Sequence, residues 1–140
     1  MGNFFDTSIE LEIKTYDIDF AGVVSNIVYV RWLEDLRLAM LAKHYPLNDQ
    51  VNQGLVPAIL QTRIDYKKAL SLFDRVHGRC WVSDIQKIKV VINFKILHNQ
   101  EVAAFAEQTA LFVGLTRKRP VPVPDDLKAK YETWLTNNTQ

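Results

Sequence analysis

The chain has only one cysteine, Cys80, and only three histidines. No disulfide can form within the chain, and no pair of thiolates is available for a zinc site. The three histidines, His44, His77 and His98, stand far apart in the sequence, so we expect no metal site. Cys80 lies in a segment with the pattern of a strand, with no histidine or asparagine placed to activate it, and we expect it to be buried.

The chain also lacks an excess of charge of either sign. It has 17 Lys and Arg residues against 16 Asp and Glu residues, for a formal net charge of +1. This balance gives no overall field to hold a nucleic-acid backbone or an anionic membrane. There is no apolar run of about eighteen residues, and residues 1–10 lack the basic and apolar segments of a signal peptide. We therefore expect a cytoplasmic protein with no nucleic-acid partner and no membrane partner.

Familiar catalytic motifs are missing as well. The chain has no Gly-rich phosphate loop, no Gly-x-Ser-x-Gly sequence and no His-x-x-x-His pair. Its 140 residues are 48% hydrophobic and 24% charged, which is the length and composition of one folded domain. We expect a single domain over residues 1–140.

Hydrophobic periodicity predicts one strand, one long helix and then four strands. Residues 7–16 alternate between apolar and polar side chains, which predicts a strand with one face in water. Residues 28–43 carry apolar side chains at helical spacing, after the N-cap types Ser25 and Asn26 and before Pro46, which stops a helix. Segments rich in β-branched and aromatic residues then predict an antiparallel sheet from 55–66, 75–85, 87–98 and 101–116. These elements predict an α+β domain in which the sheet packs on one helix.

The connections carry their own signals. Residues 98–100 are typical of a tight turn that joins two strands as a hairpin, and the polar residues 48–54 favour a short helical turn. Near the C-terminus, three prolines predict a stiff extended segment. A short helix is expected to follow at 125–135, with two acids at its positive end.

The loop before the long helix is the best candidate for a reactive site, because it carries Asp17, Asp19 and Gly22. The first N–H groups of a helix have no partner within the helix, and they stabilise oxyanions. With a turn at Gly22, the Asp19 carboxylate and the N–H groups near Asn26 can face one pocket. A carbonyl group held there would be polarised by an amide and attacked by the carboxylate or by a water. Alternatively, both acids form turns or favour the helix dipole, and the residue types alone leave this open.

Several segments carry a resemblance to a known family. Residues 16–24, Tyr-Asp-Ile-Asp-Phe-Ala-Gly-Val-Val, and residues 29–34, Tyr-Val-Arg-Trp-Leu-Glu, resemble the signature of the hotdog-fold acyl-CoA thioesterases of the 4-hydroxybenzoyl-CoA thioesterase type. Similar elements stand at 64–66, 73–74 and 119–124, so the resemblance covers nearly the whole chain. It implies a hotdog fold, in which a five-stranded antiparallel sheet wraps a long central helix, with a short C-terminal helix in this chain.

The resemblance also implies roles for residues of the loop. Asp19 falls on the position of the acid that serves as nucleophile or general base in thioester hydrolysis, and Asp17 looks like a supporting turn residue. The backbone N–H of Asn26 would donate to the thioester oxygen. The loop residues expected to lie against the substrate are Gly22, Val23 and Ser25.

Family members of this type hold the nucleotide end of coenzyme A with basic side chains near the surface. Arg119 matches one such position, and Lys87 and Lys89 lie in the segment that supplies others. Arg and Lys suit phosphate groups by charge and by geometry. For the two lysines, a solvated strand face is the alternative.

The implied reaction is hydrolysis of an acyl-CoA to the free acid and CoA, without a metal or organic cofactor. The implied assembly is a homodimer or homotetramer with active sites at the subunit interface. An aromatic acyl-CoA, such as hydroxybenzoyl-CoA or dihydroxynaphthoyl-CoA, is an alternative substrate. A hotdog protein that binds an acyl thioester without turnover is the alternative from another class.

Two further groups of residues are open to test. Some hotdog enzymes place their acid on the long helix, where this chain has Glu34 and Asp35. Arg31 precedes both acids at helical spacing, so we expect surface ion pairs there instead. Candidates for an acyl pocket are Phe20, Trp32 and Leu60, for each of which ordinary core packing is the alternative.

Overall fold

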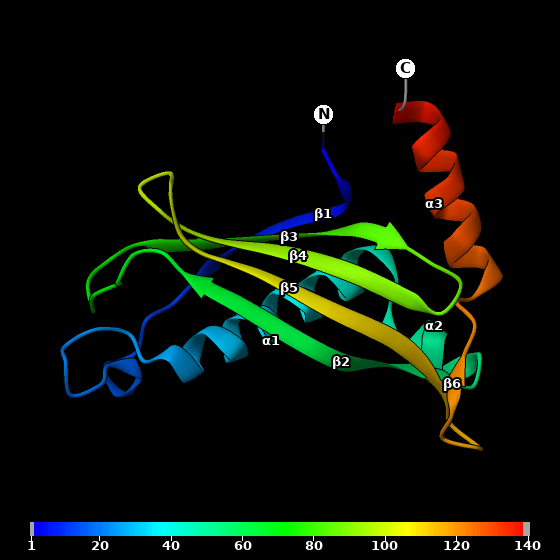
Figure 1. Cartoon of the computed structure of the whole chain (residues 1–140), viewed down its shortest axis with the longest axis horizontal. Coiled ribbons are helices and arrows are strands. Elements are labelled where there is room, and N and C mark those ends of the chain that lie inside the picture. The colour runs from blue at the N-terminus through cyan, green and yellow to red at the C-terminus, as the bar shows by residue number, and fades with distance from the viewer. Residues whose placement is uncertain (1, 139–140) are drawn as a thin grey trace.

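The computed structural model describes residues 2–138, in which one antiparallel sheet packs across a long helix (Figure 1). The strand order is β1 (Phe4–Leu11), β3 (Val76–Ile85), β4 (Lys89–His98), β5 (Glu101–Gly114) and β2 (Leu55–Tyr66), and the short β6 (Pro120–Val121) pairs with β5. All these pairs are antiparallel. The helices are α1 (Asn26–His44), α2 (Leu47–Asn52) and α3 (Asp125–Asn138). The predicted α+β hotdog fold is confirmed, and β6 adds a short strand to the five that were expected.

The first strand is shorter than its sequence pattern predicts. Alternation runs over 7–16, but β1 ends at Leu11, and Thr15–Asp17 form a 3-10 turn, η1. Leu11 is paired with Val76, which is the first residue of β3, so β1 has no strand to pair with beyond this point. A strand is stabilised by its cross-strand neighbours, and alternation without a partner does not extend it.

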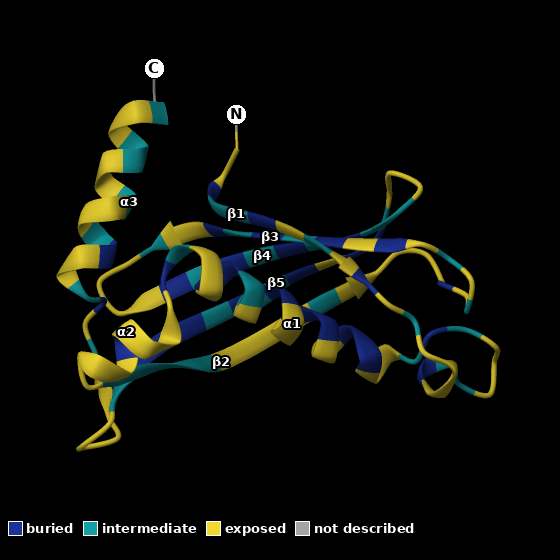
Figure 2. Cartoon of the chain, turned by 180° about the vertical axis from the view of Figure 1, so that it is seen from behind, coloured by how far each residue is buried: buried dark blue, intermediate teal, exposed yellow. Residues whose placement is uncertain are grey.

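The long helix α1 buries one face against the sheet, as Figure 2 shows by its dark blue stripe. Ser25 is the N-cap residue, as its type predicts, although its side chain makes no capping hydrogen bond. The buried residues recur at helical spacing and are Val28, Tyr29, Trp32, Leu33, Leu36, Met40 and Leu41. This face fixes the direction of α1, so its N-terminus and the preceding loop project at one end of the sheet (Figure 1).

The helix comes close to the sheet at Gly78 in β3. A Cβ atom at this position would lie 2.6 Å from Cδ1 of Leu36 and 2.9 Å from Cδ1 of Leu11. Cys80, further along the same strand, is fully buried as predicted, and burial raises the pKa of its thiol to about 12. A thiol with such a pKa is protonated at neutral pH and does not act as a nucleophile.

The connections follow their sequence signals. Asn99 and Gln100 both have positive φ, 50° and 66°, in the two-residue turn between β4 and β5, and this pair of left-handed residues suits a tight hairpin. The helical turn expected within 48–54 is present as α2.

Both edges of the sheet are open in the described chain. β1 forms one edge and β2 the other. β2 is exposed through most of its second half, which appears yellow in Figure 2. Within residues 2–138, no helix has the length and apolar character needed to cross a membrane.

Candidate active site

The loop between η1 and α1 is a tight hairpin-like turn. Ile18 and Val24 form an isolated antiparallel bridge, and the N–H of Asp19 donates to the carbonyl oxygen of Val23 at 2.9 Å. The N–H of Gly22 donates back to the carbonyl oxygen of Asp19 at 3.0 Å. Gly22 has a φ of 81°, in the left-handed region that glycine adopts without strain. These bonds fix the shape of the loop just before the start of α1.

Asp17 is the buried anchor of this loop. Its side chain is 1% exposed and accepts hydrogen bonds from both terminal nitrogens of Arg31, at 3.1 and 3.0 Å, and from the N–H of Lys14 at 2.8 Å. Its carbonyl oxygen accepts from the N–H of Ser25 at 2.8 Å. Asp17 therefore joins η1, the loop and α1, which confirms its expected role as a supporting turn residue.

The ionisation of Asp17 follows from these contacts. Burial raises the pKa of the carboxyl group, but the hydrogen bonds and positive charge of Arg31, together with the Lys14 N–H, outweigh it and leave the pKa below its ordinary value. The expectation that Arg31 pairs with Glu34 or Asp35 is wrong, because its guanidinium is bound to Asp17, while Glu34 pairs with Arg37 at 3.4 Å. Sequence spacing favoured partners on the same helix, whereas the folded loop supplies a buried carboxylate that binds two nitrogens at once.

Asp19 is half-buried, and its two carboxylate oxygens have different surroundings. Oδ1 accepts a hydrogen bond from the N–H of Ala21 at 2.8 Å, which closes an Asx turn. Oδ2 accepts no hydrogen bond from the described residues. The two interpretations of this acid are compatible, because turn formation uses one oxygen and leaves the other available for chemistry.

The start of α1 offers a backbone donor. The N–H of Val28 donates to the carbonyl oxygen of Ser25 at 3.0 Å, but the N–H of Asn26 meets no acceptor among residues 2–138. The hydroxyl of Tyr66 donates to the carbonyl oxygen of Asn26 at 3.2 Å. This bond ties the helix start to the end of β2 and leaves the Asn26 N–H able to donate to a ligand.

A shallow pocket of about 210 Å³ lies beside this donor. It is lined by Val23, Val24, Asn26, Tyr29, Tyr66, Lys67, Lys68 and Ala69. The rings of Tyr29 and Tyr66 meet edge to face, with centroids 5.0 Å apart. Sequence reasoning assigned no site role to Tyr66 or Lys67. The signal that could have found them is their place at the end of a predicted strand, where Tyr66 closes the 64–66 segment and Lys67 follows it.

The predicted coenzyme A residues lie at the other end of the molecule. The carbonyl oxygen of Arg119 accepts a hydrogen bond from the N–H of Gly114. Gly114 in turn pairs with Leu55 at the start of β2. Tyr66 ends β2, and at about 3.3 Å per residue the two ends are roughly 35 Å apart. Lys89 begins β4, opposite Leu111, on the same side as Arg119, and exposed Lys87 precedes it. Within one chain the structure thus separates Lys87, Lys89 and Arg119 from the loop residues Asp19, Gly22, Val23, Ser25 and Asn26.

The three candidates for an acyl pocket differ in burial. Trp32 is 1% exposed and belongs to the core of α1, which is the ordinary packing considered for it. Phe20 and Leu60 are exposed, so neither belongs to the core of this chain. Exposed apolar side chains that stand singly are common on protein surfaces, so exposure alone assigns neither residue to an acyl pocket.

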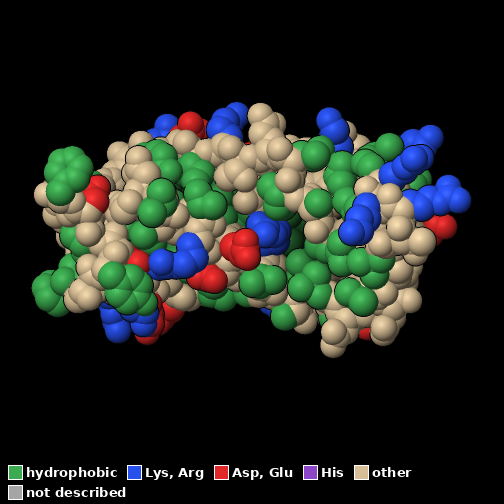
Figure 3. Space-filling model, turned by 90° about the horizontal axis from the view of Figure 1, so that it is seen from below, with side chains coloured by type: hydrophobic (Ala, Val, Ile, Leu, Met, Phe, Trp, Pro, Cys, Tyr) green, Lys and Arg blue, Asp and Glu red, His purple; other side chains and the backbone are tan. Residues whose placement is uncertain are grey.

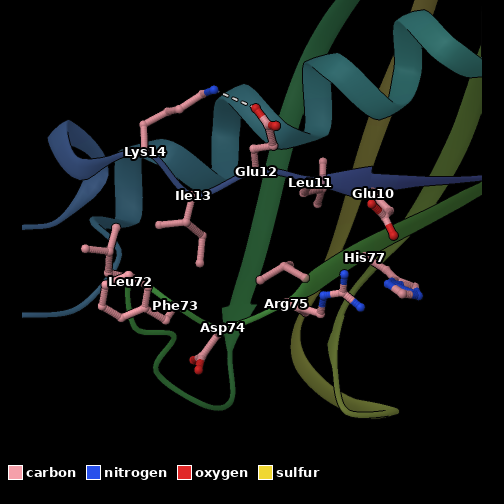
Figure 4. A pocket seen from close by; sticks show the side chains of 11 residues that line it. Glu10, Leu11, Glu12, Ile13, Lys14, Leu72, Phe73, Asp74, Arg75 and His77 are labelled. Carbon is pink, nitrogen blue, oxygen red and sulfur yellow. Dashed lines mark hydrogen bonds and ion pairs between the residues drawn. The ribbon is translucent and has the colours of Figure 1, made fainter.

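A second, polar pocket of about 320 Å³ lies at the β1 edge (Figure 4). Its charged lining residues are Glu10, Glu12, Lys14, Asp74 and Arg75, and Lys14 forms an ion pair with Glu12. Asp19 lines neither pocket, but Asn26 lines the one at the start of α1, so we place the candidate site there. The described part of the chain contains no group of three or more His, Cys, Asp or Glu side chains suited to a metal ion.

Comparison with known families agrees with the fold. A family model described as the thioesterase-like superfamily matches residues 13–131. The chain belongs to the thioesterase-like superfamily, and the predicted enzyme class, the thioester hydrolases, is the class that this family defines.

Individual relatives are distant. YneP of Bacillus subtilis (strain 168), described as a candidate acyl-CoA thioesterase, is 25% identical over 88 residues, which are 62% of this chain and 64% of that protein. The chain thus spans less than two thirds of this relative. The chloroplastic acyl-acyl carrier protein thioesterase ATL3 of Arabidopsis thaliana is 25% identical over 130 residues, 91% of this chain and 68% of that protein. The solved structure of a DHNA-CoA thioesterase from Staphylococcus aureus superposes with a TM-score of 0.84 at 20% identity, over 96% of this chain and 95% of that chain, and this likeness shows the fold.

Proposed function

We propose that the protein is an acyl-CoA thioesterase that hydrolyses an acyl-CoA to the free acid and CoA. The observation that carries the proposal is the unpartnered N–H of Asn26 at the start of α1, beside a pocket and beside the loop that holds Asp19. An N–H at a helix start stabilises the negative charge that develops on a carbonyl oxygen under attack. Membership of the thioesterase-like superfamily supports the same chemistry.

In this mechanism the thioester carbonyl oxygen accepts the hydrogen bond of the Asn26 N–H. Oδ2 of Asp19 then takes a proton from a water molecule, and the water oxygen attacks the carbonyl carbon. The carbon–sulfur bond breaks, the sulfur of CoA leaves with a proton, and the carboxylic acid remains. In the alternative route, the Asp19 carboxylate attacks the carbonyl carbon, the carbon–sulfur bond breaks to release CoA, and water then opens the resulting anhydride to give the free acid and the Asp19 carboxylate. Both routes need one ionised acid and one backbone donor on the same carbonyl group.

The acyl group can be aliphatic or aromatic in this proposal. An aromatic acyl group, such as the hydroxybenzoyl group of the 4-hydroxybenzoyl-CoA type or a dihydroxynaphthoyl group, is favoured by the Tyr29–Tyr66 pair. These two rings offer an edge and a face beside the Asn26 donor, and aromatic groups stack on such surfaces.

We further propose that the active assembly is a homodimer, or a homotetramer built from such dimers, paired through β2. The edge of β2 and the adjoining face of α1 expose large apolar side chains, namely Ile27, Val30, Leu38, Leu60 and Tyr66. Antiparallel pairing of β2 with the β2 of a second copy would set the start of one strand beside the end of the other. The basic residue Arg119 of one copy would then lie near the Asn26 pocket of the next.

This arrangement would bring the predicted coenzyme A residues of one copy to the Asn26 pocket of the other. The nucleotide end of the substrate would contact Arg119, Lys87 and Lys89 of a second copy, and Lys67 of the same chain lines the pocket itself. Figure 3 shows Lys and Arg side chains gathered at the right-hand end of the molecule, where β6 lies in Figure 1. Phosphate groups bind such clusters through charge and hydrogen bonds.

The test is release of free thiol from a panel of acyl-CoAs with short, long and aromatic acyl groups. The proposal predicts turnover with at least one of them, at a rate that depends on enzyme concentration. A protein that binds acyl-CoA, as followed by calorimetry, but releases no thiol from any member of the panel would be a binding protein of the hotdog fold.

A further inference from the structure

Two tyrosines line the pocket at the start of α1, and their hydroxyl groups differ in their partners. The hydroxyl of Tyr66 donates to the carbonyl oxygen of Asn26 at 3.2 Å. Tyr29 is only 2% exposed, yet its hydroxyl makes no hydrogen bond with any group of residues 2–138. A buried hydroxyl without a hydrogen bond is costly, so this one calls for an acceptor that the described chain does not supply.

The oxygen of the Tyr29 hydroxyl faces the pocket. Within residues 2–138, Oε1 of Gln50 is the only side-chain oxygen or nitrogen of a non-exposed residue that is sealed from solvent and has no hydrogen-bond partner. The unpartnered oxygen of Tyr29 is therefore in contact with solvent, although the residue as a whole is buried. Tyr29 lines the pocket beside Asn26, so the hydroxyl opens into that pocket.

The helix directs this hydroxyl toward the N–H of Asn26. Tyr29 lies three residues after Asn26, so the two residues share a face of α1. Side chains of an α-helix lean toward its N-terminus, and the Tyr29 side chain therefore covers the turn that begins at Asn26. The pocket, of about 210 Å³, is small enough for one ligand group to contact both the hydroxyl and the N–H.

The ring of Tyr29 is held by two other aromatic rings. It meets Tyr66 edge to face, with centroids 5.0 Å apart and planes at 90°, and it meets Trp32 with centroids 5.2 Å apart. Burial raises the pKa of the Tyr29 hydroxyl to about 12, so the group keeps its proton at neutral pH. A rigid, protonated donor stabilises a developing negative charge without having to reorient during the reaction.

We propose that Tyr29 is a further catalytic residue, whose hydroxyl donates a second hydrogen bond to the thioester carbonyl oxygen beside the N–H of Asn26. This inference rests on the proposed thioesterase function and deepens it. A carbonyl oxygen has two lone pairs and can accept both hydrogen bonds, and the negative charge that develops on it during attack strengthens them. Tyr29 keeps its proton throughout, while the carbon–sulfur bond breaks as in the proposed mechanism.

The test is Tyr29→Phe, which removes the hydroxyl and keeps the ring. We expect kcat on the best acyl-CoA of the panel to fall about tenfold or more with little change in KM, because the hydrogen bond is strongest to the developing oxyanion. Urea denaturation should show a variant at least as stable as the wild type, since the lost hydroxyl has no partner among residues 2–138. The matched control is Tyr131→Phe on α3, at the other end of the molecule, whose kcat should stay near that of the wild type (Figure 1).

The contact itself can be followed on the carbonyl group. A ketone analogue of the same acyl-CoA, in which a methylene group replaces the sulfur, has no carbon–sulfur bond to break. Hydrogen bonds to a carbonyl oxygen lower its infrared stretching frequency. The isotope-labelled carbonyl of the bound analogue should therefore absorb at a higher frequency in Tyr29→Phe than in the wild type.

The outcomes separate this inference from the proposed function. A Tyr29→Phe protein with wild-type kcat overturns the inference and leaves the thioesterase intact. So does a bound ketone with the same carbonyl frequency in both proteins. A Tyr29→Phe protein that is unfolded or less stable than the wild type also overturns it, because the hydroxyl would then serve the fold. If the wild type releases no thiol from any acyl-CoA, the proposed function fails and this inference fails with it.

Discussion

Two acids in one loop, Asp17 and Asp19, show how surroundings divide the roles of identical side chains. Asp17 is buried and binds Arg31 with both oxygens, while Asp19 keeps one oxygen without a partner among the described residues. The sequence could suggest this division through the family resemblance, but composition alone could not. The partner of Asp17 is a helix residue fourteen positions away, and only the folded loop brings the two together.

Replacement of Asp17 by asparagine should destabilise the protein. Asn keeps a similar shape but cannot accept two charge-assisted hydrogen bonds from Arg31, so we expect a loss of about 2 kcal/mol in the free energy of unfolding. Urea denaturation followed by circular dichroism measures it. The control is Asp84→Asn, since the Asp84 side chain is exposed and, among residues 2–138, hydrogen-bonds only to Gln86; it should change stability by less than about 0.5 kcal/mol.

The stabilising effect of Asp17 should depend on pH. Because the pKa of the folded-state carboxyl is below its ordinary value, the group stabilises the fold above the unfolded-state pKa of about 3.9, and this contribution is lost as the pH falls through the lower folded-state pKa. The difference in stability between wild type and Asp17→Asn should therefore be full at neutral pH and shrink in acid. A difference that stays constant down to strongly acidic pH would show that Asp17 does not act through its charge.

At the scale of elements, periodicity predicted the strands and helices well where each has a partner. The bounds of β2 agree with the prediction, and those of α1 differ by one or two residues. β1 was predicted too long, because the alternation over 7–16 does not depend on where the partner strand β3 begins, and that point sets the end of the pairing. A polar chain in which Arg37 donates to Gln108, and Gln108 to Thr62, could not be predicted, because its members belong to three elements and meet only through helix packing and strand register.

The contact between α1 and β3 can be tested at Gly78. The methyl group of Gly78→Ala would lie too close to Leu36 and Leu11, whose side chains are themselves packed in the core. We expect a loss of about 1–3 kcal/mol in the free energy of unfolding, the usual result of overpacking. Thermal denaturation measures it against Ser83→Ala, an exposed position on the same strand. A Gly78→Ala protein as stable as the wild type would mean that the helix is not held so closely to the sheet.

At the scale of the whole molecule, the predicted site residues divide between two ends that are roughly 35 Å apart. The family resemblance placed Arg119 and Asp19 in one site. The sequence alone does not show that the two residues lie at opposite ends of β2 and cannot meet within one chain. The proposed pairing of two copies through β2 would remove the conflict, because it would place opposite ends of the two chains side by side.

Mixed dimers can test whether the site is shared. Asp19→Asn and Arg119→Ala proteins, each impaired alone at low substrate concentration, should regain activity when their subunits are exchanged. Each hybrid dimer would contain one intact site, so random mixing should give about a quarter of wild-type activity. Activity that stays at the mean of the two parents after proven subunit exchange would show that Arg119 does not serve the site of a second copy.

The central claim, that Asp19 and the Asn26 N–H act on one thioester carbonyl, is tested most directly by the kcat of Asp19→Asn on the best acyl-CoA of the panel. Asparagine can still accept the hydrogen bond from the Ala21 N–H, so the loop should keep its shape while the ionised acid is lost. We expect the kcat of Asp19→Asn to be lower than that of the wild type by roughly two to four orders of magnitude, with an unchanged free energy of unfolding. The control is Asp49→Asn on the distant helix α2, whose kcat should stay near that of the wild type. An Asp19→Asn protein with wild-type kcat would contradict the account.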